Sequence, residues 1–207
     1  MPEIQDRLKV DANATQELAS LFARQRARLE NTPKPGPSEY QQQERELLFL
    51  LILLMGGTFY MGSQAALPQL GAAEPVDMNK ANAWAIPHAR QLSRAIVANS
   101  EAAIKAGGNL EAIYGAGRAE SIAVTEITRA RVAGEKAIRD EIERSGATVV
   151  ATWRTELDAK VCSVCSPLEG EDEHRWSLDF PAGPPAHPRC RCTLEFTVSG
   201  TAQPGNN

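Results

Sequence analysis

The N-terminal part of the chain alternates between a helix-favouring stretch and a proline-rich break. Residues 6–30 are polar, and their large apolar residues lie near helical spacing: Leu18, Leu21, Phe22 and Leu29. This pattern predicts an amphipathic helix or a partner-binding arm. Residues 31–38 contain three prolines, which cannot continue a helix because proline lacks the amide donor and restricts the residue before it. We therefore expect a helical arm and a proline-rich linker over residues 1–39.

An apolar run follows the linker and continues from Leu47 to Met61 with few polar positions. These fifteen residues would cover about 22 Å as a helix, whereas the hydrocarbon core of a membrane is about 30 Å thick. A helix that is apolar on all sides is normally buried in a core or against a partner. We expect residues 47–61 to be buried, or to bind a structural partner or another copy, and not to enter a membrane.

Three prolines in residues 62–87 predict an irregular connector with at most short helical pieces: Pro68, Pro75 and Pro87. The Ala-rich sequence of residues 88–145 lacks proline and predicts two or three helices, broken near Gly107-Gly108.

Small and branched residues mark one buried face of the last of these helices: Ile127, Ala130, Gly134, Ile138 and Ile142. Gly134 on that face indicates close helix packing. Ser145-Gly146 should end the helix.

The character of the chain changes at Thr148, where a β-branched and aromatic run to Trp153 predicts a strand. The predicted fold class is α+β and mainly α-helical, with a small zinc-stapled C-terminal module. We expect a helical domain over residues 40–147, a Cys/His module over residues 148–199, and a flexible tail over residues 200–207.

Composition narrows the functional classes. The formal net charge is −4 and the sequence pI is about 5.5, which argues against a general nucleic-acid coat. The first residues carry no cationic segment followed by an apolar stretch, so we expect no secretory signal and a cytoplasmic protein.

Potential metal ligands are concentrated near the C-terminus. All four cysteines lie in residues 162–192, and a histidine precedes the last two: Cys162, Cys165, His187, Cys190 and Cys192. Two thiolates separated by two residues can occupy two corners of a zinc tetrahedron, and the second group can supply the rest. The module has too few apolar groups for a strong core of its own, so it needs such a cross-link.

Four positions must be filled from these five residues. We rank Cys162, Cys165 and Cys190 first, then His187, then Cys192. Free thiols or two disulfides are the alternative to a structural Zn²⁺, and a catalytic metal is a weaker one. Deaminase chemistry is disfavoured because neither His174 nor His187 is followed by a Glu at the His-x-Glu spacing.

The remaining polar features have simpler explanations. The acidic residues 169–173 lack the alternating spacing of a calcium loop and predict a solvated loop. His174 is expected at the surface beside Trp176. His88 follows Pro87 with no Cys or acidic neighbour in sequence and is expected to be structural.

Over residues 110–195 the chain resembles the minor head proteins of tailed Mu-type bacteriophages, the phage head morphogenesis family. The resemblance is carried by these residues in order: Thr125-Glu126, Trp153, Asp158, Cys162, Cys165, Leu168-Glu169-Gly170, and Pro184-Pro185-Ala186-His187-Pro188-Arg189-Cys190-Arg191-Cys192. In this family the position of Cys192 is also filled by Ser, which agrees with the lowest rank for Cys192.

The resemblance implies a structural protein of the phage head and not an enzyme. It would bind portal and capsid proteins in the host cytoplasm during assembly and then in the virion, and self-association is a further option. The protein would be encoded by a phage or prophage. DNA contact is left open. In this interpretation Thr125 and Glu126 tie the long helix to the module, Trp153 and Asp158 orient the ligand loops, and Arg189 and Arg191 pair with acids or a partner. The alternatives are a zinc-dependent nuclease or hydrolase acting on nucleic acid, with His187 as base or ligand, and a polymorphic-toxin carrier module.

Overall fold

The computed structural model describes residues 2–32, 34–156 and 161–201. The protein is mainly helical with a small two-stranded sheet, which confirms the predicted α+β class. Its elements in chain order are α1 (Pro2–Glu30), α2 (Pro37–Leu70), α3 (Met78–Lys105), α4 (Glu111–Tyr114), α5 (Ala116–Arg144), β1 (Ala147–Arg154), the 3₁₀ turn η1 (Ser166–Leu168), α6 (Glu173–Trp176) and β2 (Thr193–Thr201).

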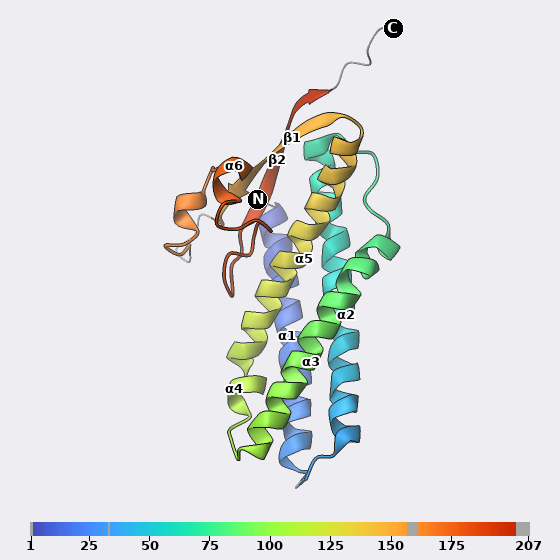
Figure 1. The fold of residues 1–207 in the computed structure, drawn as a ribbon, viewed down its shortest axis with the longest axis vertical. Coiled ribbons are helices and arrows are strands. Elements are labelled where there is room, and N and C mark those ends of the chain that lie inside the picture. The colour runs from blue at the N-terminus through green and yellow to red at the C-terminus, as the bar shows by residue number, and fades with distance from the viewer. Residues whose placement is uncertain (1, 33, 157–160, 202–207) are drawn as a thin grey trace.

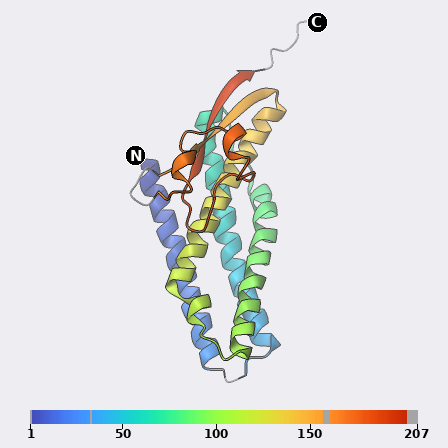
Figure 2. The ribbon, with the colours of Figure 1, turned by 60° about the vertical axis from the view of Figure 1, so that its left-hand side comes forward.

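Four long helices lie side by side along the longest axis of the molecule, and the sheet with its loops lies at one end (Figure 1). Helix α2 packs against both α3 and α5, and α5 also packs against α1. Seen from a second direction, α3 and α5 stand apart with α2 behind the space between them (Figure 2). Helix α2 is therefore the central element of the helical region.

The helices are longer than the prolines indicate, and the expected connector over residues 62–87 is wrong. Helix α2 continues through Pro68 to Leu70, and α3 begins at Met78 and runs through Pro87. Both prolines are solvent-exposed, so the carbonyl groups that lose an amide partner lie on the water side of each helix. The real break is short and begins at Gly71, whose φ of 65° ends α2 in the left-handed conformation.

The length argument against a membrane helix is also wrong. Helix α2 has 34 residues, or about 51 Å, and contains an 18-residue window of mean hydropathy 1.6, of which 44% is buried inside the protein. By length and composition alone it could span a membrane. Its inner face, however, is part of the core, where Leu47, Leu51, Met55 and Phe59 are at most 3% exposed.

Two glycines allow α2 and α5 to cross at backbone contact. A Cβ atom on Gly62 would lie 2.2 Å from the carbonyl oxygen of Arg131, and one on Gly134 would lie 1.9 Å from that of Phe59. Neither helix could approach so closely with any other residue at these positions. The expectation that Gly134 marks close helix packing is confirmed.

The sheet pairs the two ends of the C-terminal segment. Strand β1 is the predicted strand, and it pairs antiparallel with β2 from Arg154↔Thr193 to Ala147↔Thr201, with a bulge after Thr148. The inner faces of both strands and the cysteines belong to the same hydrophobic cluster as Phe59, Ala66 and Leu70 of α2. The module therefore closes one end of the helical region. The predicted tail over residues 200–207 begins too early, because Gly200 and Thr201 are paired in β2. Residues 202–207 and Asp158 lie outside the described residues.

Candidate metal centre

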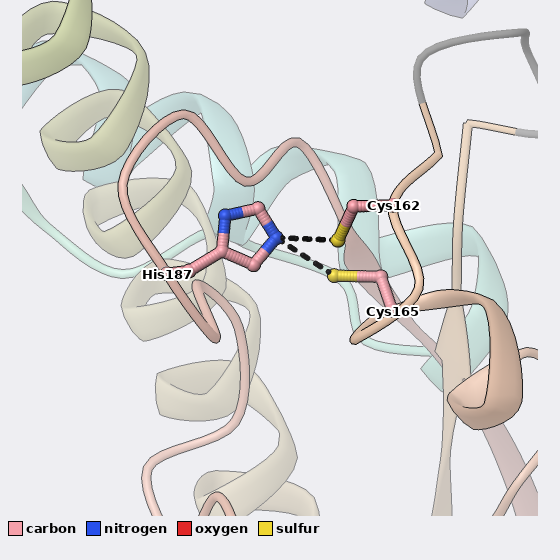
Figure 3. Close-up of side chains that lie close together, drawn as sticks. All are labelled: Cys162, Cys165 and His187. Carbon is pink, nitrogen blue, oxygen red and sulfur yellow. Dashed lines mark hydrogen bonds between the residues drawn. The ribbon is translucent and has the colours of Figure 1, made fainter.

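The structure gathers the five predicted ligands at one place beside the sheet. His187 Nε2 lies 3.0 Å from Cys162 Sγ and 3.2 Å from Cys165 Sγ, with all three side chains converging (Figure 3). Cys165 Sγ lies 3.8 Å from Cys190 Sγ. Two groups of three potential ligands thus share Cys165: Cys162, Cys165 and His187, and Cys165, Cys190 and Cys192. The Cys/His cluster could hold a metal ion.

The imidazole of His187 is oriented for metal binding. Its Nδ1 lies 2.8 Å from the carbonyl oxygen of Pro188. Since a carbonyl only accepts hydrogen bonds, Nδ1 donates the proton and Nε2 is left with its lone pair directed at the two sulfurs. A backbone carbonyl bound to the second ring nitrogen is the usual support of a metal-bound histidine.

Burial and hydrogen bonding shift the pKa values of the thiols of the second group in different directions. Burial raises the pKa of Cys165 to about 12. A hydrogen bond from the Cys192 thiol lowers the pKa of Cys190 to about 5, and donating that bond raises the pKa of Cys192. Within this pair Cys190 is therefore the hydrogen-bond acceptor and Cys192 the donor.

The space at the centre of the cluster is small. The cavity has a volume of about 30 Å³ and is lined by the five potential ligands together with Val161, Glu156, Arg189 and Arg191. A cavity of this size is comparable to the volume of one water molecule in the liquid. Soft sulfur and imidazole donors around so small a space fit a single bound ion such as Zn²⁺.

Helix α5 holds the second ligand loop through two threonines one turn apart. The Thr128 hydroxyl donates to the carbonyl oxygen of Cys190 at 2.8 Å, and both residues are buried. The backbone N–H of Arg189 donates to Thr125 Oγ1 at 2.9 Å. Arg189 has a left-handed φ of 63°, which is uncommon for a residue other than glycine and here lies directly beside a ligand.

The expected roles of the neighbouring residues are partly met. Thr125 does join α5 to the ligand loop, whereas the ion pair of Glu126 is with Arg129 on its own helix. Arg189 pairs with Glu120 at 3.0 Å. Thr128 was not identified from the sequence, although its position one turn after Thr125 could have indicated it.

Two tryptophans belong to the same hydrophobic cluster as Cys165, Cys190 and Cys192. Trp153 and Trp176 are fully buried, with ring centroids 5.9 Å apart in an edge-to-face arrangement. Trp176 Nε1 donates to the carbonyl oxygen of Ala151 at 3.2 Å. Trp176 therefore shares the packing role expected of Trp153, and its place beside His174 in the sequence does not indicate this role.

The acidic segment is more structured than a solvated loop. Its first residue, Glu169, accepts hydrogen bonds from Arg154 Nη1 and from the backbone N–H of Thr155. The side chain of Asp172 caps α6, and Glu173 pairs with Arg139 of α5. These carboxylates tie the ligand-bearing loop to β1 and α5.

The two other histidines lie away from the cluster. His174 is exposed on α6, as expected. His88 is stacked on Trp84 with ring centroids 4.3 Å apart and donates from Nδ1 to the Trp84 carbonyl oxygen.

His88 and Trp84 line a groove of about 870 Å³ between α3 and α5, with Phe59 of α2 at its floor. Two charged groups on its rim are already engaged, since Lys80 pairs with Glu141 and Arg129 with Glu126.

Comparison of the chain with protein-family models, curated proteins and solved structures finds no match in any of the three.

Proposed function

We propose that this protein is a minor structural protein of a bacteriophage head, with a structural Zn²⁺ in its C-terminal module. The proposal rests on how residues distant in sequence are arranged in space. Several of the residues on which the resemblance rests lie far apart in sequence but meet in space: the Cys/His cluster gathers, and Thr125 of α5 supports the loop bearing His187 and Cys190.

The metal would be held by Cys162, Cys165, His187 and Cys190, with Cys192 as the spare thiol. The Cys165–Cys190 sulfur separation of 3.8 Å equals one edge of a tetrahedron with Zn–S bonds of about 2.3 Å. Binding would draw Cys190 closer to Cys162 and His187, with which it does not form a single group within 4.8 Å. Bound Zn²⁺ would supply cross-linking between two loops and no reaction. Four protein donors would leave no position for water or substrate, which favours a structural role over hydrolysis.

The proposed partners are the portal and capsid proteins of the same phage. The protein would meet them in the host cytoplasm during assembly and remain in the virion. Four long helices side by side, closed at one end by the C-terminal module, give an elongated body with long side surfaces, which is compatible with a role in binding other structural proteins. DNA contact forms no part of the proposal, since the chain has a net charge of −4.

Co-expression with the portal and major capsid proteins encoded by the same genome tests this function. We expect the chain to sediment with assembled procapsids in a sucrose gradient, in fewer copies than the capsid protein. The matched control omits the portal gene, which should remove the chain from the particles if the portal recruits it. Sedimentation of the chain only with free soluble protein, in the presence of intact portal-containing procapsids, would contradict the proposal.

A further inference from the structure

The outer face of α2 is an exposed apolar strip. Phe49, Leu53 and Met61 are 68%, 56% and 45% exposed, and with Gly57 they are spaced four residues apart. Residues at this spacing follow one side of a helix. The core residues of α2 occupy the opposite side, so neither α3 nor α5 covers this strip.

Gly57, in the middle of the strip, is not explained by the fold. A glycine inside a helix costs about 0.5–1 kcal/mol relative to alanine. Gly62 and Gly134 are required because a side chain there would collide with the facing helix. A Cβ on Gly57 would meet nothing within 4 Å. Its place among exposed apolar side chains indicates a close approach by something outside this chain.

The charge pattern limits what that partner is. Helix α2 carries no Asp, Glu, Lys or Arg from Leu47 to Leu70. A partner surface opposite it must be uncharged over the same length to avoid burying unpaired charges. The same strip on a second copy meets this requirement.

The strip is also complementary to itself. If two copies of α2 cross antiparallel at Gly57, the residue four positions before the glycine faces the residue four positions after it, so Leu53 of each copy meets Met61 of the other. This two-fold arrangement is the isologous contact typical of homodimers, and it places Leu53 and Met61 opposite one another on both sides of Gly57, over about 12 Å.

We propose that the outer face of α2 is a self-association surface on which two copies of the chain cross antiparallel at Gly57. This inference does not depend on the phage function or on the metal. A lipid surface fits less well, because helices that lie on membranes carry Lys or Arg beside the apolar face. Spanning a membrane would also remove Leu47, Leu51 and Met55 from the core.

Sedimentation velocity over a concentration series tests the association of the metal-loaded, full-length chain. We expect reversible dimers, and we expect Leu53→Glu to weaken the dimer at least about tenfold by placing a charge in the contact. The matched control is Leu178→Glu, since Leu178 is 76% exposed in the C-terminal module. It should leave the dimer unchanged, and circular dichroism should show both variants folded.

A charge exchange tests the antiparallel register. The double variant Leu53→Glu/Met61→Lys should recover the dimer, because each Glu then faces a Lys of the other copy. Leu53→Glu/Met61→Glu should remain monomeric. A parallel contact would give the opposite result for the first variant, since Glu would face Glu, and would overturn the register.

Vesicle flotation tests whether the outer face of α2 binds a lipid surface instead of a second copy. With vesicles of phosphatidylcholine and phosphatidylglycerol, we expect the wild-type chain to stay in the soluble fraction. A chain that is monomeric at all concentrations, whether or not it floats with the vesicles, would overturn the proposal.

Discussion

Two neighbouring regions of this molecule are held together in different ways. At the α2–α5 crossing, Gly62 and Gly134 let two helix backbones touch, and apolar side chains fill the space along them. In the C-terminal module, a sheet of only two strands rests on two tryptophans and a cluster of cysteines. A two-stranded sheet is marginal in water without further support. The helices are therefore stabilised by packing, whereas the module offers a Cys/His cluster that could cross-link its loops by holding a metal ion.

The largest effect is expected when the first pair of thiols, Cys162 and Cys165, is removed. We expect Cys162→Ser/Cys165→Ser to abolish metal binding and to unfold the module, because structural zinc contributes about 10–16 kcal/mol in small zinc-binding peptides. The helical signal in circular dichroism should largely remain, since the helical packing does not use these residues. Metal content by elemental analysis and near-ultraviolet circular dichroism of the tryptophans measure the two effects. A metal-free variant with an unchanged tryptophan signal would refute the idea that the metal holds the module.

The sequence predicts different features of the C-terminal module and of the helical region. The Cys-x-x-Cys and His-x-x-Cys spacings identify the potential metal ligands of the module, and the structure gathers them. Helix periodicity and Gly134 predict the crossing. The ends of α2 and α3 were not predictable from Pro68 and Pro87, because a proline on the exposed side of a packed helix loses only a bond whose partner can reach water.

Other features depend on tertiary context. Strand β2 has an alternating pattern in which Leu194 and Phe196 are buried and Glu195 and Thr197 are exposed, so its sequence alone indicates a strand. The position of Thr128 one turn after Thr125 indicates that both lie on one side of α5, but nothing in the local sequence indicates that its hydroxyl binds the Cys190 carbonyl. This hydrogen bond joins residues 62 positions apart that only the fold brings together.

Separate substitution of the last two cysteines, Cys190 and Cys192, tests which residues would hold the ion. We expect Cys190→Ser to lose the metal and Cys192→Ser to keep it. The reason is that Cys190 lies three residues from His187 and carries the lowered pKa of about 5, while Cys192 acts as its hydrogen-bond donor. Metal stoichiometry and the intensity of cobalt–thiolate absorption after Co²⁺ substitution measure the difference. Equal loss in both variants would mean that both sulfurs bind and that His187 lies outside the ligand set.

The helical region should respond to changes in packing and not to chelation. We expect Gly134→Ala to cost about 3 kcal/mol of unfolding free energy or more, because its Cβ would lie 1.9 Å from the Phe59 carbonyl oxygen. Gly57→Ala is the matched control on an open helix surface and should gain about 0.5–1 kcal/mol. Urea unfolding at concentrations where the chain is monomeric compares them. A loss below 1 kcal/mol for Gly134→Ala would show that the two helices can separate at little cost.

The smallest expected effect lies at the junction between the regions, where Glu169 binds Arg154 and the backbone of Thr155. Burial raises the pKa of Glu169, but the hydrogen bonds from Thr155 and Arg154 outweigh it, so the net pKa lies below the ordinary value of 4.5. A carboxyl group with a lowered folded-state pKa stabilises the fold above its unfolded pKa, and this contribution is lost as the pH falls through the folded-state value.

We therefore expect Glu169→Gln to cost about 1 kcal/mol at pH 7, with the difference from wild type shrinking below about pH 4.5. Glu195→Gln is the control, because Glu195 also pairs with Arg154 but its side chain is 50% exposed, and exposed pairs contribute little. Its effect should be smaller and should change less with pH. Urea unfolding at pH 7 and at pH 4 provides both differences, and subtracting each variant from wild type at the same pH removes the common loss of metal in acid. A Glu169→Gln effect that is the same at both pH values would show that the carboxylate charge contributes nothing and that shape alone fixes the loop.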